Sequence, residues 1–177
     1  MEILISLLTL LLVLSFLLKG TFLPRWGTVA ACVLLAVFVR LVIPWLAGQP
    51  AAIVSGWLTA PDKILDGAVC LVLEAVLMIA FCFSRPAGRF RFLRWYPGLL
   101  AFPAVCRAWS LVLFSRPGLD FTRFAWTASL ATLAAALGAA WLLRKLIPEE
   151  EIRLEGLFLI NLFLLLATVA ATGAITF

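Results

Sequence analysis

The chain has 177 residues, of which 65% are hydrophobic and 13% are charged, and its formal net charge is +5. A soluble domain is about 45–50% apolar and about 25% charged, so this composition excludes a soluble enzyme and a secreted disulfide scaffold. The mean hydropathy of +1.16 indicates an integral membrane protein.

The apolar runs predict six membrane-spanning helices, because one helical crossing needs about 20 apolar residues. In chain order, the predicted spans are 3–18, 27–47, 63–83, 97–114, 121–143 and 156–177. Helices are expected because every backbone polar group in hydrocarbon must find a partner within the protein. The run 7–18 also lacks the alternation of a β-barrel strand. We therefore expect an all-α fold, a polytopic membrane helix bundle that forms a single domain over residues 1–177.

The basic residues predict the orientation of this bundle. The connectors after the first, third and fifth spans contain nine Lys and Arg residues, and the other side contains three. Since connectors rich in Lys and Arg stay in the cytoplasm, both termini are expected on the non-cytoplasmic side. The tryptophans support these span positions, because all except Trp109 fall near predicted span ends. Tryptophan favours this level, where the lipid headgroups lie.

Two charged residues fall at the centres of predicted spans. Glu74 lies in the middle of the third span and Arg107 in the middle of the fourth. A charge at this depth costs about 2.5–3.5 kcal/mol, so we expect the two side chains to form a buried ion pair across an antiparallel hairpin.

Glu74 also ends a four-residue repeat formed with Asp62, Asp66 and Cys70. This spacing places the four side chains on one slowly drifting stripe of a helix. One interpretation is a proton or cation path that enters from the outside and ends at Glu74. The other is structural: the aspartates complement the helix start, Cys70 packs as a small hydrophobic residue, and Glu74 ties two helices together.

Two further polar residues lie within predicted spans. Arg40 precedes Pro44 by four residues, and it either extends to the outer headgroups or lines a small cavity at the proline kink. Asn161 shares one face of the last span with Thr168, Thr172 and Thr176. These side chains are expected to form hydrogen bonds to neighbouring helices.

Small residues recur every four positions in the last two spans, at Ala131, Ala135 and Ala139 and at Ala167 and Ala171. This pattern permits close approach of helices. It indicates either packing of the final hairpin or a seam for another subunit.

The connector at 85–96 alternates basic and aromatic residues. Its arginines are Arg85, Arg89, Arg91 and Arg94. These charges set the topology, and they are also candidates for docking anionic lipid headgroups or a partner protein. No nucleic-acid partner is expected at a membrane surface.

The residues for common catalytic sites are missing from the sequence. There is no histidine, the four cysteines lie inside predicted spans without a C-x-x-C pair, and no glycine-rich phosphate loop occurs. We therefore predict no catalytic, cofactor-binding or metal-binding residues, and no enzyme activity.

Three functions remain open at this point. The first is an accessory or core subunit of a larger membrane complex of the transport type, since the short connectors leave no room for a soluble domain. The second is a stand-alone transporter or ion-coupled permease that uses Glu74 and Arg107. An intramembrane enzyme is a remote third. The expected location is a bacterial inner membrane, and the expected partners are the lipid bilayer and either another membrane protein or further copies of the chain.

Overall fold

A computed structural model describes residues 2–50, 61–83, 93, 95–115 and 120–176, and it describes side chains over 5–50, 65–83, 93, 95–115 and 120–172. The elements are helices: α1 (Glu2–Gly20), α2 (Arg25–Ala47), α4 (Pro61–Phe83), α5 (Ala101–Ser115), α6 (Phe121–Leu146) and α7 (Glu150–Thr176). No β-strand occurs in this part of the chain. The predicted all-α fold is confirmed.

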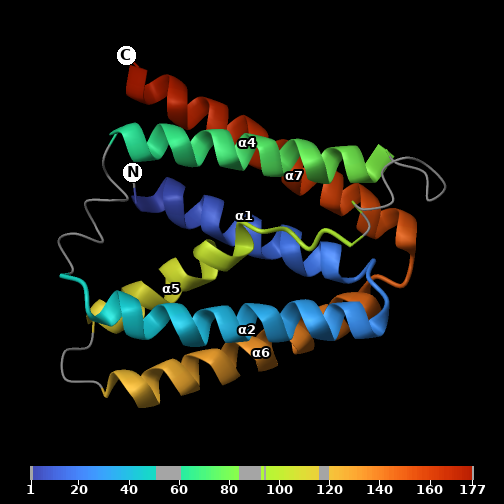
Figure 1. Cartoon of the computed structure of the whole chain (residues 1–177). Helices are drawn as coiled ribbons and strands as arrows, with labels where there is room; N and C mark the ends of the chain where they lie inside the picture. The colour runs from blue at the N-terminus through green and yellow to red at the C-terminus, as the bar shows by residue number, and fades with distance from the viewer. Residues whose placement is uncertain (1, 51–60, 84–92, 94, 116–119, 177) are drawn as a thin grey trace.

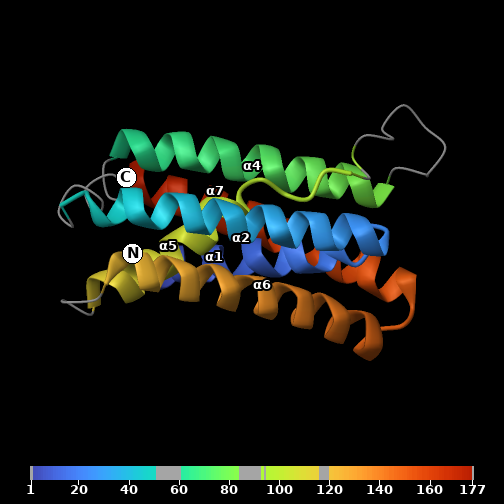
Figure 2. The same cartoon turned by 60° about the horizontal axis from the view of Figure 1, so that its bottom comes forward.

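The helices form a bundle in which α1 has a central place (Figure 1). Helix α1 packs against α7 and α5, helix α2 packs against α6 and α5, and helix α4 packs against α7. Both termini lie at one end of the bundle in Figures 1 and 2, and the turns from α1 to α2 and from α6 to α7 lie at the other. We call this second end, with residues 20–25 and 146–150, the basic end.

Short helix α5 contributes to each of the three apolar clusters of the core. Ala104 packs with residues of α1, α4 and α7, Cys106 packs with α2 and α6, and Ala101 packs with α1 and α2. Helix α5 therefore fills the space between the α1/α4/α7 group and the α2/α6 pair, and its position decides how these groups fit together.

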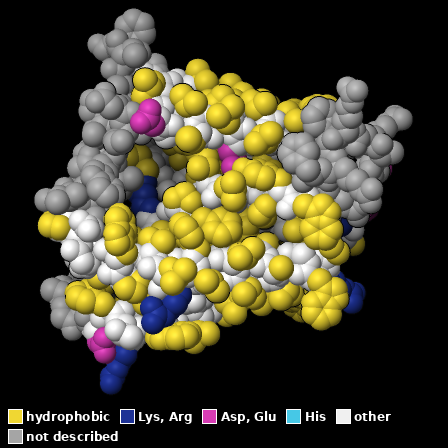
Figure 3. Space-filling model, viewed as in Figure 1, with side chains coloured by type: hydrophobic (Ala, Val, Ile, Leu, Met, Phe, Trp, Pro, Cys, Tyr) yellow, Lys and Arg dark blue, Asp and Glu magenta, His cyan; other side chains and the backbone are white. Residues whose placement is uncertain are grey.

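The outside of the bundle is apolar over most of its described surface. Figure 3 shows hydrophobic side chains spread across one face, with few charged groups among them. Large hydrophobic residues are exposed on several helices, including Leu10, Leu41, Leu73, Leu111, Leu130 and Leu159. Four stretches are long and apolar enough to cross a membrane: Arg25–Ala47, Leu65–Phe83, Phe121–Leu146 and Glu150–Thr172. Apolar surface on this scale is unfavourable in water, and together these features indicate a membrane-embedded protein.

The fourth predicted span differs from the structure. Its helix begins at Ala101, and Pro97 and Gly98 precede it in non-helical backbone. With 15 residues, α5 is about 22 Å long, which is shorter than the ~30 Å hydrocarbon core of a bilayer. The chain therefore enters the bundle in irregular backbone before α5 starts, where sequence analysis predicts a helix across the whole span.

The small residues of α6 do not pack the final hairpin together. Helix α6 packs mainly against α2, and α7 packs against α4 and α1. The side of α6 that faces α2 is itself made of small residues, namely Ala125, Ala128, Ser129, Thr132, Ala136 and Ala140. In contrast, Ala131 and Ala135 of the predicted repeat are exposed, so the hairpin interpretation is wrong for this part of the repeat.

Candidate functional site

Glu74 lies inside the bundle on α4, with only 6% of its surface exposed. Its carboxylate accepts a hydrogen bond from the Tyr96 hydroxyl at an Oη–Oε2 distance of 2.5 Å. Hydrogen bonds to a charged group are short and about twice as strong as neutral ones. This bond ties α4 to the irregular segment that leads into α5.

The same carboxylate lies beside the two residues that directly precede short helix α5. The backbone N–H groups of Leu99 and Leu100 lie near it, and the Leu99 N–H donates to the Tyr96 hydroxyl at 3.4 Å. The first N–H groups of a helix have no partner within the helix, and the helix dipole favours negative charge at this end. Glu74, which belongs to a different helix, is therefore placed where its negative charge complements the start of α5.

Gly98 allows the chain to pass this close to Glu74. Its φ is +95°, and a Cβ at this position would lie 3.0 Å from Glu74 Oε1 and 3.0 Å from Met78 Cε. A positive φ is unfavourable for residues with a side chain, and the space is also occupied. Glycine is thus required for both conformation and close approach.

The expected ion pair between Glu74 and Arg107 is not formed. Over the described residues, the ion pairs within 4.0 Å comprise only Arg123 with Asp120, near the start of α6. Arg107 is the seventh residue of α5, so it lies about 9 Å along the helix axis from the residue that starts it. Because Glu74 faces that start, the two side chains occupy different depths.

Other members of the predicted polar stripe lie apart from Glu74. Asp66 and Cys70 are exposed on α4, whereas Glu74 is buried. The side chain of Asp62 lies outside the described residues. The stripe therefore drifts from the surface of the bundle into its interior, as its four-residue spacing implies.

Arg40 contacts an aromatic ring on a neighbouring helix. Its guanidinium carbon lies 4.7 Å from the centroid of the Trp126 ring on α6, which is the geometry of a cation–π interaction. This contact fits a side chain that extends along the bundle towards the headgroups.

Asn161 is fully buried and connects α7 to α1. Its Nδ2 donates to Ser15 Oγ at 2.9 Å and to the Leu157 carbonyl at 2.8 Å. Thr168 instead donates to the carbonyl of Leu164 in its own helix. Asn161 thus has satisfied partners inside the bundle, which is the arrangement expected of a structural residue.

The predicted docking arginines Arg85, Arg89, Arg91 and Arg94 lie outside the described residues. Among the residues that are described, no group of three or more Cys, Asp or Glu is placed to hold a metal ion.

From the sequence, the cations at the basic end are expected only to set the membrane topology, yet in the structure several of them contact other side chains. Lys19 is fully buried, with its ammonium over the ring of Phe81, and Arg153 lies over the ring of Phe22 at 5.5 Å. These contacts join residues far apart in the chain, and the only signal in the sequence is the position of cations near aromatic residues at span ends.

Arg144 also makes contacts that the sequence does not predict. Its Nη2 donates to the carbonyls of Gly20 at 3.1 Å and Leu23 at 2.8 Å, and to Thr28 Oγ1 at 2.8 Å. The guanidinium thereby holds the turn from α1 to α2 against the end of α6.

Comparison with known proteins gives no relative: no family model, no curated protein and no solved structure matches the chain.

Proposed function

We propose that the chain is a subunit of a larger membrane complex and that α6 is the helix that docks to a partner. The observation that supports this proposal is a second row of small residues on α6, turned away from α2. Its members are Thr127, Ala131, Ala134, Ala135 and Gly138, all of which are exposed. We call this row the outward stripe.

The outward stripe is suited to contact between helices in lipid. Lipid tails are as apolar as leucine, so helices associate there through close packing, and small residues let two backbones approach. The opposite row of small residues on α6 already packs against α2. A second row of the same kind, with no described helix against it, favours an external partner over lipid contact alone.

Enlarging one residue of the outward stripe tests the proposal. The tagged chain is purified in mild detergent, and the mass of the particle is measured by native mass spectrometry. We expect the wild type to occur in a complex with another membrane polypeptide at a fixed ratio. We expect Ala135→Leu to dissociate this complex while the helical circular dichroism stays unchanged, because the added side chain separates the backbones.

The matched control is Leu130→Phe, which enlarges an exposed residue of α6 outside the stripe. This control is expected to keep the complex intact. A wild-type particle with a single copy of the chain, or an Ala135→Leu particle of unchanged mass, would contradict the proposal. A particle that contains only copies of this chain favours a stand-alone protein instead.

We also propose that the protein resides in a bacterial inner membrane with its basic end towards the cytoplasm. The support is the uneven distribution of Lys and Arg between the two sets of connectors, since cytoplasmic connectors are enriched in these residues.

Proton or cation transport is a second candidate function, favoured by the place of Glu74. A buried carboxylate lies near the N–H groups of the two residues that precede a helix starting inside the bundle. Ionisable groups inside membranes often belong to proton relays, and helices that begin within the membrane surround the ion and substrate sites of many transporters. Glu74 is the residue proposed to bind the proton or cation.

Proton flux into liposomes that contain the purified protein tests this second candidate. A pH-sensitive dye inside the liposomes reports the flux after a pH jump, with valinomycin present to remove the membrane potential. We expect the wild type to exceed empty liposomes and Glu74→Gln to reduce the rate at least tenfold, because the amide does not exchange a proton. Glu155→Gln, at an exposed carboxylate of α7, should keep the wild-type rate. Equal proton-flux rates for the wild type and Glu74→Gln would show that the Glu74 carboxylate is not part of a proton path.

A further inference from the structure

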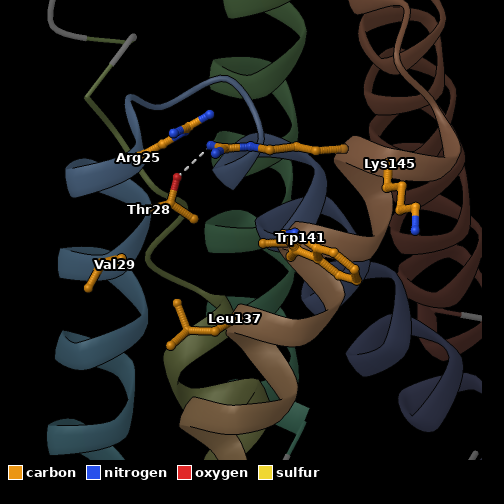
Figure 4. A pocket seen from close by; sticks show the side chains of 8 residues that line it. Arg25, Thr28, Val29, Leu137, Trp141 and Lys145 are labelled. Atoms are coloured by element: carbon orange, nitrogen blue, oxygen red, sulfur yellow. Dashed lines mark hydrogen bonds between the residues drawn. The ribbon is translucent and has the colours of Figure 1, made fainter.

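A groove of about 600 Å³ lies at the basic end between the first turns of α2 and the last turns of α6. Figure 4 shows Arg25 on α2 near the helix ends, and Lys145 on the last turn of α6 with its side chain directed away from Arg25 to the level of Trp141. Val29 and Leu137 lie deeper along the two helices. The groove is therefore basic at its mouth and apolar along its length. No acidic residue lines it.

No carboxylate among the described side chains neutralises the positive charge at the mouth. Arg25 and Arg153 lie close enough to Arg144 for their like charges to act on it, and Lys145 is the next residue along α6. The nearest carboxylates in sequence, Glu149–Glu151, are exposed, and no ion pair joins them to these cations within the described part of the chain. An anion at the mouth would relieve this repulsion.

Arg144 fixes the shape of the mouth, and the two other cations that line the groove, Arg25 and Lys145, remain available. Its hydrogen bonds to Gly20, Leu23 and Thr28 hold the α1–α2 turn beside α6. The Lys145 ammonium lies 5.3 Å from the centroid of the Trp141 ring. Neither Arg25 nor Lys145 makes a hydrogen bond or ion pair with another described residue. Their charged groups can therefore turn towards a ligand without any loss of packing inside the bundle.

We propose that this groove binds one anionic phospholipid from the leaflet at the basic end. The phosphate lies between Arg25 and Lys145, and an acyl chain follows the apolar surface of Val29, Leu137 and Trp141. Basic pockets between membrane helices on the cytoplasmic side are suited to acidic lipid headgroups. Trp26 and Trp141 are 86% and 64% exposed, and such tryptophans favour the headgroup level, which places the mouth where a lipid phosphate occurs. A soluble phosphate would leave the apolar length of the groove unused.

Native mass spectrometry of the purified chain with added lipids tests this proposal. The probes are dioleoyl phosphatidylglycerol, dioleoyl phosphatidylcholine and water-soluble glycerophosphoglycerol. We expect one phosphatidylglycerol to bind in preference to phosphatidylcholine, and the soluble headgroup not to displace it. Arg25→Gln and Lys145→Gln should each weaken phosphatidylglycerol binding roughly fivefold, the effect expected of removing one basic side chain near an anionic lipid.

The matched control is Arg123→Gln, which removes an exposed cation at the opposite end of the bundle. It should leave phosphatidylglycerol binding unchanged. Equal binding of the two lipids by the wild type would overturn the proposal, and so would an equal loss in all three variants, because the charge effect would then be general. Displacement by glycerophosphoglycerol at the same concentration would show that the site binds a soluble phosphate and not a lipid. The comparison of lipids on the wild type needs no variant, so it stands even where a variant fails to fold.

Discussion

Gly98→Ala is expected to lower the free energy of unfolding by about 2–4 kcal/mol. Two separate costs add at this position. The backbone φ of +95° is unfavourable for a residue with a Cβ, and the new methyl group would meet Glu74 Oε1 and Met78 Cε, each at 3.0 Å. Met78 is only 1% exposed, so its end has little room to move away. Relaxation would instead shift the Glu74 carboxylate and disturb its contact with the start of α5.

The measurement is thermal or denaturant unfolding of the purified protein in mild detergent, followed by circular dichroism. Gly67→Ala is the matched control, because Gly67 lies within α4 and nothing lies within 4 Å of the Cβ that the substitution adds. Alanine in a helix interior stabilises by roughly 0.5–1 kcal/mol relative to glycine, so the control should be neutral or slightly more stable. A Gly98→Ala protein as stable as the wild type would mean that the backbone before α5 is not held in this conformation.

The sequence predicts the helical membrane class and most helix positions because these depend on long apolar runs. It does not predict the start of α5. The predicted span from 97 to 114 is apolar throughout, and hydrophobicity alone does not separate a buried irregular segment from a helix. The one local signal is the Pro97-Gly98 pair, a combination typical of turns. Given full weight, that pair would have moved the helix start beyond residue 98.

The partner of Glu74 is missed for a related reason. Glu74 and Arg107 would lie at the same depth only if the fourth span were one regular helix. Once α5 starts at Ala101, that register is lost, and Tyr96, the only tyrosine of the chain, takes the place of the arginine. The Arg144 contacts with the α1–α2 turn span more than 100 residues, so no local spacing could have indicated them.

A double-mutant cycle on Glu74 and Tyr96 is expected to give strong coupling. Tyr96→Phe removes the donor to Oε2, and Glu74→Gln removes the charge that strengthens this bond and complements the start of α5. Each change should cost about 1.5–3 kcal/mol, the range for hydrogen bonds to charged groups. The double variant should cost little more than the larger single change, because both substitutions remove the same interaction. Unfolding in mild detergent measures all four proteins.

The control cycle pairs Glu74→Gln with Ser129→Ala. Ser129 donates to the Ala36 carbonyl at 2.8 Å, between α6 and α2, and among the described residues it shares no hydrogen-bond partner with Glu74. These two changes should add to within about 0.5 kcal/mol. Additive costs for Glu74 and Tyr96 would contradict the contact between them.

Together with the proton-flux experiment, this cycle distinguishes a structural role of Glu74 from a role in transport. If coupling is strong and proton flux is unchanged in Glu74→Gln, then the carboxylate serves only to complement the start of α5. If both respond, the residue that holds α5 in place is also the residue that binds the proton, so transport would be linked to the position of this helix.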